Sequence, residues 1–156
     1  MEQVISSIKV NTKGQGLINI TNLVKEFIRE NNFLNGILIL NVLHTSCSLT
    51  LNEQADPNVL HDLSKDIESI VPYISYKDLN IQPQKITYEH YQEGEDDMPA
   101  HIKTALTNNS LSLSFQNEKL IIGVWQAIYL WEHRYERKER VVNIHAIGEK
   151  KKNQSL

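Results

Sequence analysis

The stretch HTSCSLTLNEQADPNVLHDL, residues 44–63, joins a strand pattern directly to a helix pattern. Leu49 and Leu51 fall on one face of a strand, and the hydroxyl and amide residues between them fall on the other, because side chains alternate along a strand. Asp56 and Pro57 then combine a helix-capping acceptor with a proline at the first helical position. The stretch therefore predicts a strand that delivers the chain to a helix N-terminus.

The same two patterns recur along the chain. Alternation of apolar and polar residues predicts strands near residues 4–10, 36–42, 111–115, 120–130 and 140–147. Amphipathic segments predict helices capped by Thr21 and Asp56, and a shorter one opening near Asp97 that buries Ile102, Ala105 and Leu106. Because the strands and helices do not alternate regularly, the pattern favours an α+β fold: mostly antiparallel β-sheets forming a sandwich, with about three helices packed outside.

Composition restricts the class of protein. With 156 residues, 40% of them apolar and 22% charged, we expect one globular domain, residues 1–148, followed by a basic tail, residues 149–156. A net charge of −3 favours neither nucleic acid nor acidic membranes as a partner, and the apolar runs are too short to span a bilayer. Cys47, the single cysteine, fits a reducing compartment, and the first residues do not read as a signal peptide. We expect a cytoplasmic location.

The first polar cluster lies where the quoted strand meets its helix. Asn52, Glu53 and Asp56 gather there, at a place suited to anions or a metal ion. Asp56 has an alternative role as the helix cap. Cys47 has His44 three residues before it, but a lone cysteine among strand residues is more often a packed group than a nucleophile.

The second cluster is YEHYQEGEDDMPAH, residues 88–101, which has five carboxylates and two histidines. One interpretation is an acidic loop in solvent. The other is a metal site: Asp97 and His101 are one helical turn apart, and His90, His101 and His44 would supply three nitrogen ligands. Three nitrogens favour zinc, whereas oxygens from the acidic residues would favour magnesium. The spacing matches no dedicated zinc motif.

The third cluster is GVWQAIYLWEHR, residues 123–134. Trp125 and Gln126 are candidates to line a pocket for an aromatic heterocycle, although an aromatic edge at an interface is the alternative. Glu132 falls among apolar residues, where a polar group needs a partner. The connector that follows, EHRYERKER, is so highly charged that we expect a solvated hairpin tip, with His133 exposed on it.

Taken together, these blocks resemble the YjbQ family, whose members are described as secondary thiamine-phosphate synthases. The resemblance lies in HTSCSLTLNEQADPNVLHDL (44–63), GEDDMPAHIKTAL (94–106), NSLSLSF (109–115) and GVWQAIYLWE (123–132). It runs from Val4 to Gly148 and depends on the order and spacing of the blocks as well as on their residues. The chain departs from the family pattern at Cys47, where relatives have a small residue, and in the longer, basic tip after Glu132.

The resemblance implies a small α+β homotrimer that joins hydroxymethylpyrimidine diphosphate to thiazole phosphate and releases diphosphate, commonly with magnesium. The matching positions are His44, Asn52, Glu53, Asp56, Asp62, Asp97, His101, Trp125, Gln126 and Glu132, with a histidine also usual at His90 and a basic residue at Arg140.

From the residues and the resemblance we assign candidate roles. The catalytic candidates are Glu53, Asp56, Asp97 and Glu132; the substrate-binding candidates are Asn52, Trp125, Gln126 and Arg140; the ligands of a divalent ion, zinc or magnesium, are His44, His90 and His101. A diphosphate site normally recruits several cations, and near the clusters there are only Lys103, Arg134 and Arg140. A metal-dependent hydrolase and a non-catalytic binding trimer therefore remain as alternatives. In each case we expect these side chains to meet in one hollow.

Overall fold

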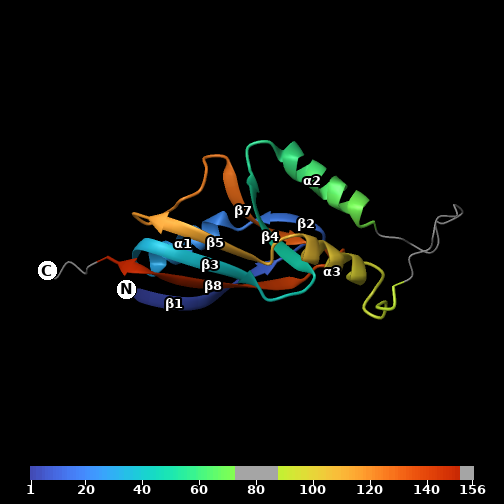
Figure 1. Cartoon of the computed structure of the whole chain (residues 1–156), viewed down its shortest axis with the longest axis horizontal. Helices are drawn as coiled ribbons and strands as arrows, with labels where there is room; N and C mark the ends of the chain where they lie inside the picture. The colour runs from blue at the N-terminus through green and yellow to red at the C-terminus, as the bar shows by residue number, and fades with distance from the viewer. Residues whose placement is uncertain (73–87, 152–156) are drawn as a thin grey trace, which may run out of the picture.

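Two antiparallel sheets form the body of the protein (Figure 1). The structure, a computed structural model, describes residues 1–72 and 88–151. The large sheet has the strand order β1-β8-β3-β5-β6, and the small sheet has the order β2-β7-β4. The elements are β1 (Glu2–Asn11), β2 (Gly16–Asn19), α1 (Thr21–Glu30), β3 (Phe33–Val42), β4 (Cys47–Glu53), α2 (Pro57–Ile70), α3 (Asp97–Leu106), β5 (Ser110–Gln116), β6 (Lys119–Leu120), β7 (Gln126–Glu132) and β8 (Glu139–Lys150).

The hydrophobic core lies between the two sheets and α1. Leu40 of β3 and Ile144 of β8 belong to the same cluster as Leu49 of β4 and Leu130 of β7, and all four are fully buried. Val24 on the inner face of α1 joins this cluster. Burial of each such side chain stabilises the fold by about 1.5–3 kcal/mol. The predicted α+β fold with antiparallel sheets and three helices is confirmed.

The N-termini of α1 and α2 show which helix start the local sequence predicts correctly. The Asp56 carboxylate accepts the Asn58 backbone N–H at 2.9 Å, and Pro57 is the first helical residue, as predicted. Thr21, by contrast, is not a cap. The capping position of α1 is Ile20, and the Thr21 hydroxyl accepts the Ile128 backbone N–H at 2.9 Å. Thr21 therefore joins α1 to β7.

Two predicted element boundaries are wrong. The expected strand over residues 120–130 is interrupted, because β6 ends at Leu120 and β7 begins only at Gln126. The last strand continues through Lys150, beyond the domain end expected at residue 148. Of the predicted tail, residues 152–156 lie outside the described residues.

The buried face of α3 also differs from the prediction. Leu106 is 59% exposed, while Asp97, Ala100 and Lys103 are buried. Lys103 is buried because its ammonium donates to the Glu68 carboxylate of α2. An ion pair between two helices decides which side of α3 faces inward, and the apolar pattern of the helix does not.

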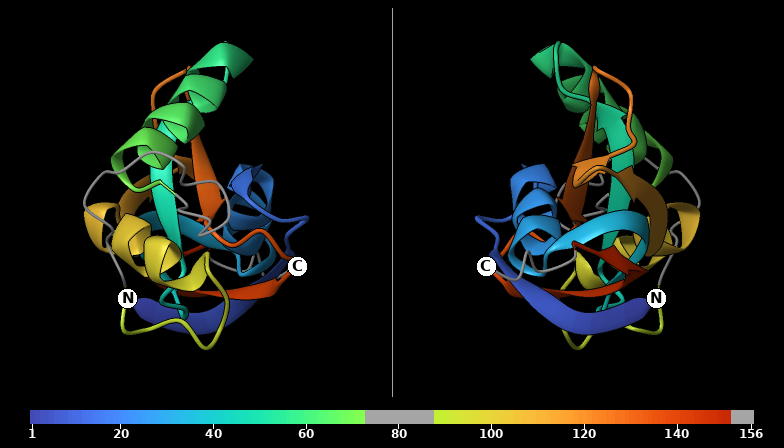
Figure 2. Two further views of the ribbon diagram at one scale, coloured as in Figure 1. Left: turned by 90° about the vertical axis from the view of Figure 1, so that its right-hand side faces the viewer. Right: turned by 90° about the vertical axis from the view of Figure 1, so that its left-hand side faces the viewer.

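Among the helices that the structure describes, α2 is the one without a buried residue, and Ile70 at its end is 66% exposed. Both views in Figure 2 show α2 projecting beyond the two sheets. Glu68 ties it to the body by accepting hydrogen bonds from Lys103 and Gln15. Among the described helices, none combines the length and hydrophobicity that crossing a membrane requires.

Candidate metal centre

Two histidines and an aspartate converge where α3 begins. Asp97 and His101 lie one turn apart on α3, and His90 comes from the loop before it. The Asp97 Oδ2 atom lies 2.7 Å from His90 Nε2 and 3.2 Å from His101 Nε2. One ligand atom from each of these residues lies within 4.8 Å of the other two. We call this set the His–Asp–His group.

The tautomer of His101 favours a cation beside the Asp97 carboxylate. Its Nδ1 lies 2.9 Å from the Thr45 carbonyl oxygen, which can only accept, so Nδ1 carries the proton. In a neutral ring Nε2 then points a lone pair at a carboxylate oxygen of Asp97, which is repulsive. A proton or a metal ion between the two atoms removes the repulsion. A histidine whose second nitrogen is held by a backbone carbonyl is also the usual form of a metal-bound histidine.

Arg134 holds the other side of the same aspartate. Its Nη1 donates to Asp97 Oδ1, its Nε donates to Asp96 Oδ2 at 3.0 Å, and its Nη2 donates to the Glu93 carbonyl at 2.6 Å. Burial by itself would raise the pKa of Asp96, but hydrogen bonds from the Tyr135 backbone N–H and from Arg134 lower it below its usual value. The guanidinium fixes Asp97 and leaves one carboxylate oxygen directed at the imidazoles.

The expected solvated hairpin tip is right for its middle, because residues 135–137 and 139 are exposed, but the prediction that His133 is exposed is wrong. His133 and Arg134 are 1% and 7% exposed, because the first residues after β7 turn inward. The His133 Nε2 lies 2.9 Å from the Ser48 hydroxyl, and burial lowers the pKa of His133 to about 4. Nothing in the sequence around it distinguished this histidine from a surface residue.

Glu132 and Arg140 form a buried ion pair. Arg140 Nε lies 2.7 Å from Glu132 Oε2, and Nη2 lies 2.5 Å from Oε1. Oε1 also accepts the backbone N–H groups of His133 and Arg134, each at 3.0 Å. Burial alone would lower the pKa of Arg140, but the bonds to Glu132 raise it. Glu132 has the partner that the sequence demanded, and its bonds give it a structural role, not the predicted catalytic one.

His44 lies beside the group but is not part of it. Its Nε2 accepts the Val141 backbone N–H at 3.0 Å, which places its own proton on Nδ1. Burial, then the positive charge of Arg140, lower the pKa of His44. The predicted set of three histidines thus becomes two histidines and Asp97.

A cavity of about 340 Å³ opens over the His–Asp–His group. Arg134, Lys138 and Arg140 line it together with His44 and Glu93. Arg134 and Arg140 were already counted from the sequence, and the connector adds Lys138 to them. Both guanidiniums are bound to carboxylates, whereas Lys138 pairs with the exposed Glu136 at 3.1 Å.

The remaining predicted residues lie at the other end of the small sheet. In the β4–β7 ladder Cys47 pairs with Glu132, whereas Glu53 pairs with Gln126. The two pairs lie six residues apart along the strands, a distance of about 20 Å. Asn52, Glu53, Trp125 and Gln126 therefore do not reach the His–Asp–His group within one chain, and a single hollow stays a prediction that requires two neighbouring copies. At that end Asp56 serves as the α2 cap, and Asp62 is an exposed residue of α2.

Comparison with known proteins identifies the family of the chain. The family model described as "UPF0047 protein YjbQ-like" matches residues 6–149. The chain belongs to the YjbQ family. The UPF0047 protein sll1880 of Synechocystis is 36% identical over 140 residues, which is 90% of this chain and 88% of that protein. The YjbQ protein of Escherichia coli O157:H7 is 36% identical over 82% of this chain and 86% of its own length.

A solved structure agrees with the YjbQ fold. The crystal structure of a YjbQ/UPF0047 protein from Clostridium acetobutylicum matches with a TM-score of 0.74 at 30% identity, covering 92% of this chain and 99% of that one. These comparisons support the family and its fold. The chemistry has to be argued from the site.

Proposed function

We propose that this YjbQ protein is a metal-dependent enzyme that acts on a small phosphorylated substrate in the cavity over the His–Asp–His group. The observation that carries the proposal is the Asp97 oxygen held between two imidazole nitrogens, 2.7 and 3.2 Å away. Two imidazoles and one carboxylate suit zinc or a similar transition metal better than magnesium, which prefers oxygen ligands alone. When bound, such an ion would polarise a phosphate oxygen or activate water.

The residues of the chain have separate tasks in this proposal. His90, Asp97 and His101 would hold the ion; Thr45 orients His101, and Arg134 orients Asp97. Arg134 and Arg140 are bound to buried carboxylates, whereas the Lys138 ammonium is paired with the exposed carboxylate of Glu136. Lys138 is therefore the cation on the cavity wall that is most available to a substrate. We assign it to the substrate phosphate.

The family resemblance points to a thiamine-phosphate synthase-like transferase. In that reaction the leaving diphosphate must be stabilised as it departs, which a cavity with a cation site and three basic side chains suits. The second candidate is a hydrolase of a small phosphorylated metabolite. It is favoured by the ligand count, since three protein ligands with an open position are typical of zinc sites that activate water.

We propose further that the protein works as a cytoplasmic homotrimer. The half-exposed apolar stripe of α2, formed by Val59, Leu60, Leu63, Ile67 and Ile70, is a surface that a neighbouring copy would cover. Cys47, buried as a free thiol, suits a reducing compartment. Light scattering on a sizing column tests the trimer, and a mass of one chain would contradict it.

A two-product assay separates the catalytic candidates. Zinc-loaded or magnesium-loaded protein is incubated with hydroxymethylpyrimidine diphosphate and thiazole phosphate, and thiamine phosphate and released phosphate are both quantified. Thiamine phosphate formation that is lost in His101→Ala and kept in His61→Ala, an exposed histidine on α2, supports the transferase. Phosphate release without coupling, with the same dependence on His101, supports the hydrolase. If neither product exceeds the uncatalysed background with folded, metal-loaded protein, the proposal of an enzyme acting on these substrates is wrong.

A further inference from the structure

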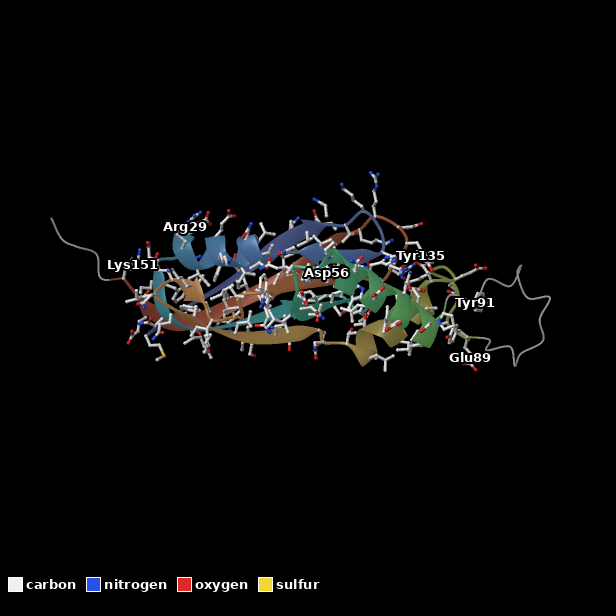
Figure 3. The ribbon with its side chains drawn as sticks, turned by 90° about the horizontal axis from the view of Figure 1, so that it is seen from above. Arg29, Asp56, Glu89, Tyr91, Tyr135 and Lys151 are labelled. Atoms are coloured by element: carbon white, nitrogen blue, oxygen red, sulfur yellow. The ribbon has the colours of Figure 1, made fainter. Side chains whose placement is uncertain are left out.

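A second cleft lies between α1 and the loop that joins β6 to β7. Its volume is about 690 Å³, larger than the cavity over the His–Asp–His group. Residues of α1, of the turn between β5 and β6, and residues 122–124 and 126 form its walls. Arg29 on α1 and the residues Tyr91 and Tyr135 near the metal centre are at opposite ends of the molecule in Figure 3.

The cleft carries an excess of uncompensated positive charge. Lys25 and Arg29 are one turn apart on α1, and Lys119 of β6 is on the same lining. No ion pair joins any of these three to a carboxylate in the part of the chain that the structure describes. Of the two acids on the lining, Glu118 is paired with Lys151, which leaves Glu26. A positive cleft on a protein of net charge −3 attracts anions locally.

The opposite wall is apolar and has an amide edge. Ile122 and Val124 line the cleft, and Val124 is 80% exposed. Gln126 accepts the Gly123 backbone N–H through Oε1 at 2.6 Å, which fixes its amide and leaves the NH₂ group as a donor. Trp125, 63% exposed, lies between two of these lining residues. An aromatic ring packs well on such a wall, and a fixed amide can hydrogen-bond its edge.

We infer that this cleft is a second ligand site, which binds a nucleotide-sized phosphorylated aromatic compound. The phosphate contacts Lys25 and Arg29, and the ring packs against the apolar wall formed by Ile122 and Val124. The site includes Gln126, at one end of β7; Glu132, whose partner Arg140 lines the cavity over the His–Asp–His group, is at the other end, about 20 Å along the strand. Binding there is independent of the metal ion.

The test uses AMP, adenosine and inorganic phosphate as probes of the full chain. Calorimetric titration gives the affinities, and tryptophan fluorescence locates the ligand, since Trp125 is exposed and Trp131 is 6% exposed. We expect AMP to bind more tightly than either fragment and to quench the emission. The double variant Lys25→Gln/Arg29→Gln should weaken AMP binding at least about tenfold, because each lost charge-assisted hydrogen bond is worth that much.

Two control variants keep the result interpretable. Lys65→Gln removes an exposed charge from α2, and it should leave AMP affinity unchanged. His101→Ala should also leave it unchanged, whatever that variant does to metal binding or activity. The inference is overturned if AMP does not bind at millimolar concentration, if adenosine binds as tightly as AMP, or if either control weakens binding as much as the double variant.

Discussion

His133 makes a specific contribution to the acid stability of this fold. Its side chain is 1% exposed, and burial lowers its pKa from 6.5 to about 4. Between these values the unfolded chain binds a proton that the folded protein excludes. The stabilisation is therefore complete above pH 6.5 and is lost as the pH falls to 4. A pKa lowered from 6.5 to about 4 corresponds to about 3 kcal/mol over that interval, and about 2 kcal/mol of it is lost by pH 5.

Urea denaturation of wild type and His133→Gln between pH 7.5 and pH 4.5 measures this term. The glutamine amide can still reach the Ser48 hydroxyl but does not titrate. We expect the variant to be less stable at pH 7.5 because the core repacks, but to lose about 2–3 kcal/mol less than wild type on acidification. Protein concentration is held constant in case subunits associate. His61→Gln, on the surface of α2, should follow wild type. Parallel losses in wild type and His133→Gln would refute a buried neutral histidine.

Three further outcomes follow from the buried groups. Arg140→Met should lower the free energy of unfolding, measured by urea denaturation, by about 3–5 kcal/mol, because Glu132 stays buried without its partner. Adding Glu132→Gln should recover part of this loss, and equal stabilities of the single and double variants would contradict the reasoning. Cys47 should resist thiol reagents at pH 8 in the folded protein and react after denaturation, because burial raises its pKa to about 12; rapid labelling of folded protein would show the site to be open. Gly148→Ala should lower the free energy of unfolding by about 1–3 kcal/mol or more, because the alanine Cβ meets the Asn35 carbonyl across the β3–β8 pair. An unchanged melting temperature would mean that the two strands separate easily.

The parts of the fold that sequence predicted well are those with local causes. The strand around Leu49 and Leu51 and the Asp56–Pro57 helix start depend on residues a few positions apart, and both are present in the structure, but Ser48 on the predicted polar face is fully buried. The fold class followed from the same patterns. The pairing of Asp97 with His101 was also foreseeable, since residues four apart meet on a helix.

The rest depended on contacts between distant residues. Arg134 turns inward because it binds Asp96 and Asp97. These carboxylates lie nearly forty positions earlier in the sequence, and the run of charges around Arg134 gives no sign of the pairing. Lys103 is buried for the same kind of reason, through Glu68. The separation of Gln126 from the His–Asp–His group follows from the β4–β7 register, which the sequence alone does not set. The grouping of the candidate residues into two places within one chain therefore required the structure.

The metal content of purified protein tests the central claim most directly. Elemental analysis after zinc loading and desalting should find a stoichiometric ion in wild type. It should find none in His101→Ala, and a retained ion in His44→Gln, whose amide oxygen can still accept the Val141 N–H. Zinc retained by His101→Ala, or lost equally from His44→Gln, would contradict a metal centre built from His90, Asp97 and His101.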